Sequence, residues 1–250
     1  MGTSAGWPLP RLGCNCNICA SDDSKDSRLR PSILINDEVL IDVPPDIYQE
    51  ITRLKINTSK IKFLFITHTH DDHIVGLFDL SHIYNQPEKI TLFATRSQIA
   101  ALQNKLRMSL RSLKIREVRP LEKINLESES FATLIPVDHG SIESYGIKFK
   151  SPKPIFYAPE FRKILPSSKK AIGDLDLAII DGSSQTSFGQ AKNHQTIEEG
   201  LRLGKEIKAK KVLFTNIGHK TDTHVNLCKF VKKEGGDKFA ISYDGLEIKL

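Results

Sequence analysis

The segment from His68 to His73 places three imidazoles and two carboxylates within six positions. Neutral imidazole nitrogen and carboxylate oxygen are ligands that hold Zn²⁺, Mn²⁺ or Fe in proteins. His68 and His70 are two residues apart, so at the end of an extended strand their side chains point the same way. Asp72 and His73 follow in the turn, where they can face a second ion roughly 4 Å from the first. The spacing therefore predicts a hydrolytic metal centre in preference to a solvated polar loop.

The histidine run lies between two predicted elements that would position it. Ile61–Thr67 is apolar enough for a buried strand, and Asp72–Tyr84 carries the apolar stripe of a helix. In α/β folds, ligands bind at the ends of strands, where the chain turns into the next helix. We therefore expect the run at the edge of a sheet.

Alternating strands and helices are predicted along the rest of the chain. Pro44 and Pro45 directly precede the first helix, as suits a helix start. This order predicts two sheets with helices on their outer faces, an α/β (α+β) fold. Further strands are predicted at Ser32–Ile35, Val39–Val43, Ile90–Ala94, Phe131–Pro136, Ile147–Ser151, Ile155–Tyr157, Leu177–Ile180, Lys211–Asn216, Phe239–Tyr243 and Leu246–Leu250, and further helices at Asp46–Leu54, Ser97–Leu110, Thr196–Ile207 and His224–Lys233.

The pattern His68-x-His70-x-Asp72-His73 resembles the signature of the metallo-β-lactamase superfamily. The resemblance implies a hydrolase with a four-layer αββα sandwich and one or two metal ions at one edge of the two sheets. We expect residues 1–250 to form a single domain of this kind.

The start of the chain narrows the resemblance to one branch. Gly2–Gly6 and Cys14-Asn-Cys-Asn-Ile-Cys19 resemble the phosphoribosyl cyclic phosphodiesterase of phosphonate breakdown and its relatives. The pyrroloquinoline-quinone biosynthesis B protein has a similar cysteine-rich start. The likeness runs in patches from residue 2 to about residue 224. Relatives usually begin with a strand that ends in the Gly-Thr turn, so we expect that first strand to be missing here.

Later strand ends supply the other ligands that the resemblance implies. His139 matches the third histidine of the first ion site, beside His68 and His70. Glu160 stands where relatives place an aspartate that bridges both ions, and its side chain is one methylene longer. Asp181 also ends a buried strand and is either an alternative carboxylate ligand or a cap of the following turn.

Asn216 is the main departure from the family pattern. It replaces the histidine that completes the second ion site in relatives, whose strand ends in Thr-His-x-x-His. An amide oxygen carries no charge and suits harder ions better than Zn²⁺. The second site is therefore expected to be weak, differently filled or empty, although a single ion would still allow ester hydrolysis.

His194 is the candidate for proton transfer. Its segment, Asn193–Glu199, resembles the family segment in which a histidine faces the scissile phosphate. His194 would act as a general acid or phosphate donor, or alternatively as a simple helix N-cap. Asp72 is a second candidate for protonating the leaving oxygen. The predicted reaction is attack of a metal-bound hydroxide on a cyclic phosphate, nucleotide or related phosphodiester, with zinc as the expected ion and manganese or iron as alternatives.

The cysteine-rich run implies a separate, structural zinc site. In the cyclic phosphodiesterase such a run and a late histidine hold zinc, and Cys14, Cys16, Cys19 and His219 match this pattern, with His224 as a substitute fourth ligand. Three thiolates and one imidazole form a closed tetrahedral set, which suits structure and not catalysis. Cysteines used for ligation instead of disulfides indicate a reducing, cytoplasmic setting.

The composition agrees with a globular chain of 250 residues that is 39% hydrophobic and 26% charged. No apolar run approaches 18 residues, which predicts no membrane span, and the N-terminus lacks a secretory signal pattern. A net charge of +6, with basic clusters at 105–119, 162–170 and 205–211, agrees with a small phosphorylated substrate or a nucleic acid, although a solvated lysine-rich face explains it more simply. A sheet edge left bare by a missing strand would allow a homodimer.

Three alternatives stand beside the phosphodiesterase. An RNA-processing nuclease shares the fold, but the chain has no long inserted arm to grip a tRNA. An iron-dependent oxidative enzyme, resembling the pyrroloquinoline-quinone biosynthesis B protein, would consume oxygen. A non-catalytic module would bind a nucleotide or RNA while the altered second site stays inert.

Overall fold

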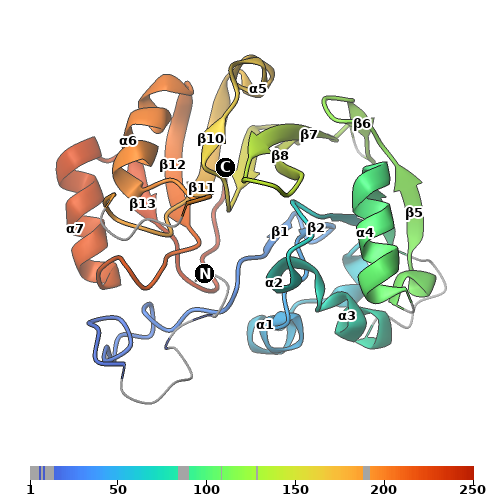
Figure 1. The fold of residues 1–250 in the computed structure, drawn as a ribbon, viewed down its shortest axis with the longest axis horizontal. Coiled ribbons are helices and arrows are strands. Elements are labelled where there is room, and N and C mark those ends of the chain that lie inside the picture. The colour runs from blue at the N-terminus through green and yellow to red at the C-terminus, as the bar shows by residue number, and fades with distance from the viewer. Residues whose placement is uncertain are drawn as a thin grey trace.

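Two β-sheets face each other and helices cover their outer surfaces (Figure 1). The computed structural model describes Gly6, Pro8 and residues 14–83, 90–107, 109–127, 129–187 and 192–250. Of the Gly2–Gly6 motif, only Gly6 is among the described residues, so the predicted Gly-Thr turn lies outside them.

The smaller sheet has the strand order β1-β2-β3-β4-β5. β1 pairs with β2 in antiparallel fashion, and the pairs from β2 to β5 are parallel. Its strands are β1 (Ile33–Ile35), β2 (Val39–Ile41), β3 (Phe63–Phe65), β4 (Thr91–Ala94) and β5 (Lys114–Glu117), and its helices are α1 (Ile47–Leu54), α2 (Asp71–Ile74), α3 (Leu77–Ile83) and α4 (Arg96–Leu106), with short 3-10 turns at Thr58–Lys60 and Ser109–Ser112.

The larger sheet has the order β10-β7-β8-β9-β11-β12-β13, and β6 pairs with β7. The pairs up to β8–β9 are antiparallel, whereas β9, β11, β12 and β13 run parallel. Its strands are β6 (Ile124–Asn125), β7 (Phe131–Asp138), β8 (Ser144–Lys150), β9 (Pro154–Ala158), β10 (Lys163–Ile164), β11 (Leu175–Asp181), β12 (Ala209–Thr215) and β13 (Phe239–Ile241), and its helices are α5 (Pro166–Ile172), α6 (Ile197–Glu206) and α7 (His224–Gly235).

The alternation of side chains along each strand divides the interior into three apolar layers. In β3, Phe65 points into the core between the two sheets, while Leu64 and Ile66, which directly follows the strand, point into the core under α1, α3 and α4. In β11, Ile179 faces the core between the sheets and Ile180 faces α5 to α7. Three cores between four layers confirm the predicted αββα sandwich.

The predicted helix Asp72–Tyr84 is interrupted, and the interruption positions the candidate site. Val43 donates its backbone N–H to the carbonyl of His73, and Gly76 donates to the carbonyl of Val43. These bonds replace helical ones, so the helix divides into α2 and α3 at Gly76. The end of β2 is thereby held against the turn that carries His73.

Other differences lie at the ends of the chain and on exposed strands. Leu246–Leu250 was predicted as a strand but forms none; Leu246 instead packs against the core between the sheets. β5 was not predicted because its residues Lys114–Glu117 are mostly charged and largely exposed. The pattern of a hydrophobic strand is absent there, and pairing with β4 alone forms the strand. The short β6 and β10 and the helix α5 were also not predicted.

A cavity of about 930 Å³ lies between the sheets and is lined by residues of β1, by Leu177 and Ile179 of β11 and by the C-terminal segment. Burial together with the charge of Asp244 raises the pKa of Glu50, on the wall of this cavity, to about 8. None of the residues predicted to do chemistry lines this cavity.

In the described part of the chain, no helix combines the length and apolar character needed to cross a bilayer.

Replacing Gly76 by alanine tests the close packing at the break between α2 and α3. A Cβ at this position would collide with the carbonyl oxygen of Pro44 and would lie 2.8 Å from Cγ2 of Ile47. We expect Gly76→Ala to lower the free energy of unfolding by about 1–3 kcal/mol, measured by urea denaturation. Val75→Ala, at the neighbouring and partly exposed position, should change it by less than about 0.5 kcal/mol. Equal losses in the two variants would contradict this account.

Candidate metal centre

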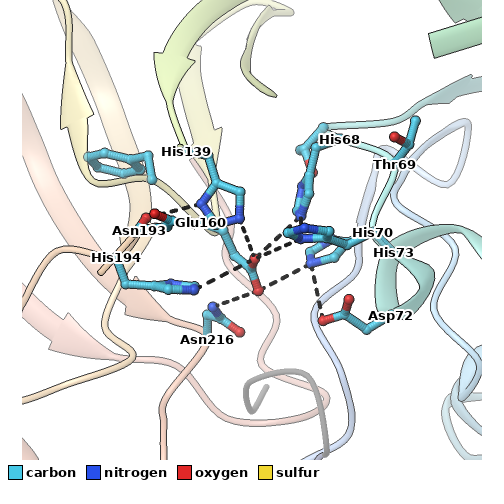
Figure 2. A network of polar contacts seen from close by, with 12 residues as sticks. His68, Thr69, His70, Asp72, His73, His139, Glu160, Asn193, His194 and Asn216 are labelled. Atoms are coloured by element: carbon cyan, nitrogen blue, oxygen red, sulfur yellow. Dashed lines mark hydrogen bonds and ion pairs between the residues drawn. The ribbon is translucent and has the colours of Figure 1, made fainter. Parts of the chain in front are cut away.

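Strand ends and turns from both sheets bring their polar side chains to one place (Figure 2). The smaller sheet contributes the turn after β3 and the helix α2, whereas the larger sheet contributes the residues after β7, β9 and β12. These side chains surround the carboxylate of Glu160; they belong to His68, His70, Asp72, His73, His139, His194 and Asn216.

The carboxylate of Glu160 joins two groups of imidazoles. Its Oε2 lies 3.3 Å from Nε2 of His68, 3.3 Å from Nε2 of His139 and 4.0 Å from Nδ1 of His70. Its Oε1 lies 3.3 Å from Nε2 of His73. One oxygen therefore faces the three-histidine group and the other faces α2, the arrangement that a bridging carboxylate needs.

Two groups of potential ligands share Glu160. In the first, His68, His70 and His139 join it, and in the second, Asp72 and His73 join it; within each group the ligand atoms lie within 4.8 Å of one another. Nε2 of His73 and Nε2 of His139 are buried and have no hydrogen-bond partner. Buried polar atoms are normally satisfied, so these two nitrogens fit a bound divalent cation.

Hydrogen bonds to the outer ring nitrogens fix how the imidazoles face the centre. The hydroxyl of Thr67 donates to Asp42, so Nδ1 of His68, 3.0 Å away, donates to that hydroxyl. Nδ1 of His139 donates to the carbonyl of Asn193 at 3.0 Å. Each ring thus turns the lone pair of Nε2 inward, which is the orientation that a metal ligand requires.

Asp42 is a site residue that the sequence reasoning missed. It follows β2, is fully buried, and accepts hydrogen bonds from the backbone N–H and hydroxyl of Thr67 and, at 2.9 Å, from Nδ1 of His73. A carboxylate on the outer nitrogen orients the ring and raises its basicity as a ligand. In the sequence, the feature that could have indicated this role is an aspartate directly after an apolar strand.

Charges in the centre set the protonation of its members. Burial lowers the pKa of His68 to about 3, which keeps this ring neutral. Burial alone would raise the pKa of Glu160, but the adjacent His73, His139 and His68 hold it well below its usual range. Burial likewise opposes charge on His73, yet Asp42 and Glu160 raise its pKa well above the usual value. A neutral imidazole beside an ionised carboxylate is the state that binds a cation, so an ion bound by His73 would displace the proton from its Nε2.

The structure separates the two candidate bridging carboxylates. Asp181, the last residue of β11, is not in either ligand group; its Oδ2 lies 2.8 Å from Nδ1 of His194. Burial would lower the pKa of His194, but the charge of Asp181 outweighs it and raises the pKa to about 9. Nε2 of His194 points to Glu160 at 4.0 Å (Figure 2). The N-cap of α6 is Thr196, so His194 does not serve as the cap.

A second cluster lies where the N-terminal loop meets the turn after β12. The Sγ atoms of Cys14, Cys16 and Cys19 are 4.0, 3.4 and 3.9 Å from Nδ1 of His219. In a tetrahedral zinc site a sulfur and a nitrogen ligand are separated by about 3.6 Å. The four side chains therefore have the spacing of a closed structural site. His224 lies elsewhere, with Nδ1 at 3.2 Å from the guanidinium of Arg28.

Comparison with known proteins identifies the family. Residues 37–217 match the model of the beta-lactamase superfamily domain. The chain is 28% identical to a solved diphosphatase of the PhnP family, with a TM-score of 0.84 over 100% of this chain and 94% of that one. It shares the fold of zinc-bound PqqB from Methylobacterium extorquens, at 20% identity and a TM-score of 0.76, covering 100% and 97% of the two chains. Fold and ligand clusters together imply that a divalent metal binds here.

A longer relative is similar over almost the whole chain. An octanoyltransferase from Porphyromonas gingivalis is 25% identical over 258 residues, which cover 98% of this chain but 49% of the relative. The chain thus spans about half the length of that protein. The match over residues 37–217, together with the αββα sandwich and its histidine-rich edge, establishes that this chain belongs to the beta-lactamase superfamily.

Proposed function

We propose that the chain is a metal-dependent phosphodiesterase that hydrolyses a cyclic phosphate, a nucleotide or a related phosphodiester. The observation that carries this proposal is the pair of ligand groups that share Glu160, with His194 at 4.0 Å from the shared carboxylate. Two adjacent cation positions and a cationic side chain suit an anionic phosphoryl group. The likeness to a diphosphatase supports the same reaction class.

Each of the two ligand groups would hold one ion. His68, His70 and His139 would hold one ion and Asp72 and His73 the other, with Glu160 between them. Ions bound there would supply Lewis acidity and a water of lowered pKa. Zinc is the ion we propose for the three-histidine group, since imidazole nitrogens suit it.

His194 is proposed to contact the phosphate or to protonate the leaving oxygen, with Asp72 as the alternative acid. The carboxylate of Asp181, at 2.8 Å, holds the ring with its Nε2 toward the centre. Because Asp181 would contact no substrate, it is a positioning residue. A protonated imidazole near neutral pH favours an anionic substrate, and the net charge of +6 agrees with a small phosphorylated molecule or a nucleic acid.

The cysteine cluster is proposed to hold a structural zinc that fixes the N-terminal loop to the turn after β12. Thiolate ligation suits a reducing compartment, so we place the protein in the cytoplasm. A homodimer is proposed only because β1 is an edge strand of the smaller sheet, where a second copy could pair.

Removing one histidine of the three-histidine group tests the central proposal. His70→Ala should lower turnover of bis(p-nitrophenyl) phosphate by about 100-fold or more and lower the bound metal by one ion per chain, because only two imidazoles then remain. Elemental analysis and steady-state kinetics measure both effects. The control is His82→Ala, which removes an exposed histidine of α3. A variant that keeps its metal and its turnover would refute the proposal.

The contact between Asp181 and His194 predicts that variants of the two residues lose activity in a coupled, non-additive way. Asp181→Asn keeps the volume of the side chain but weakens its hold on the ring, and His194→Ala removes the ring. Each should lower kcat by about 100-fold, and the double variant should be no worse than His194→Ala alone. Losses that multiply would mean that Asp181 acts independently of His194. Thermal melts of all three variants check that the fold is kept.

Loss of the cysteine cluster should affect the stability of the fold more than the catalytic reaction. The double variant Cys14→Ser, Cys16→Ser should bind one zinc less per chain and melt about 5 °C or more below the wild type, because the site ties distant segments together. Cys228→Ser is the matched control, since this thiol lies on α7 outside the cluster. If the double variant keeps all of its zinc and its melting temperature, the cluster is not a metal site.

A further inference from the structure

The two halves of the centre offer unlike ligands. The first half presents three imidazole nitrogens and one carboxylate oxygen. The second presents one imidazole, of His73, and two carboxylates, of Asp72 and Glu160. Imidazole-rich sites suit zinc, whereas carboxylate and amide oxygens suit harder ions such as manganese and magnesium. The halves are therefore not equivalent positions for the same ion.

Asn216 increases this difference. It is fully buried directly after β12, and its Nδ2 donates a hydrogen bond to Oε1 of Glu160 at 3.1 Å. This is the oxygen that faces His73 and the second half. An N–H group bonded there draws electron density from the carboxylate oxygen and adds no ligand of its own. In the family that the sequence resembles, a histidine stands at this position, and its nitrogen would be a ligand.

Two buried atoms indicate that the second half still binds a cation. Nε2 of His73 has no hydrogen-bond partner, and its Nδ1 is engaged by Asp42. Oδ1 of Asn216 is also buried and unpartnered. Rotation of the amide by a half turn would present this oxygen to an ion, a ligand of the kind that hard cations accept. The second half thus has four potential donors, three of them oxygen.

We propose that the centre is a mixed one, in which the three-histidine half retains zinc and the half formed by Asp72, His73 and Glu160 binds a harder ion that exchanges readily, with Mn²⁺ as its probe. Asn216 sets this selectivity. The inference deepens the proposed function, and it rests on that function only in requiring that the centre binds metal.

Metal content and electron paramagnetic resonance of Mn²⁺ test the inference without turnover. After dialysis against buffer without metal, the wild type should take up one Mn²⁺ per chain and release it on further dialysis. Asn216→His should retain one zinc more per chain than the wild type and should bind Mn²⁺ about tenfold more weakly. The backbone of Asn216 has a φ of 55°, a region that histidine and aspartate also adopt, so the change suits the local conformation.

A second variant and a control keep the test decisive. Asn216→Asp adds a charge at nearly constant volume and should strengthen Mn²⁺ binding by about tenfold, without adding a tightly bound zinc. Asn226→His makes the chemical change of Asn216→His on the exposed face of α7 and should leave both ions unaffected. A wild type that already retains zinc in both halves, or Asn216 variants that bind metal as the wild type does, would overturn the inference. Metal content that His70→Ala leaves unchanged would instead overturn the proposed function.

Discussion

The carboxylate of Glu160 is a buried negative charge that neither sheet can stabilise alone. Removing such a group from water is costly unless opposite charges and hydrogen-bond donors replace the solvent. The smaller sheet supplies His68 and His73, and the larger sheet supplies His139 and Asn216. Burial of this charge therefore depends on both sheets being packed against each other. The core between the sheets provides that packing, and the polar edge then becomes a single centre.

The strands show a division of roles between their middle and their ends. Residues such as Phe65 and Ile179 fill the core between the sheets, whereas the potential ligands His139, Glu160 and Asn216 follow the ends of strands. Behind the inward-facing rings, Asp42 and the carbonyl of Asn193 accept the outer N–H groups of His73 and His139. The scaffold thus fixes the lone pairs toward the centre before any ion arrives, which is how outer contacts tune a metal site.

The predictable features were those encoded locally. The order of strands and helices predicted two sheets with helices on their outer faces, and the resemblance carried by His68 to His73 implied the four-layer sandwich. The density of histidine in the same segment predicted the edge at which chemistry would occur. Contacts between distant segments could not be predicted from the sequence. Nothing near Asp42 indicates that His73, 31 residues later, is its hydrogen-bond partner. The same limit left Glu160 and Asp181 as rivals, and the fold placed one in each of two adjacent networks. Gly76 ends α2 only because Val43 and Pro44 lie against it.

The cluster of Cys14, Cys16, Cys19 and His219 joins segments that are 200 to 205 residues apart. His219 follows Asn216 by three residues, so the same turn borders the candidate metal centre and the cluster. An ion held by the cluster would bind the folded chain far better than the unfolded one, and the free energy of folding would then rise with the concentration of free ion by mass action. The supply of metal in the cell would in this way set how much of the chain is folded, independently of how well the catalytic centre is filled.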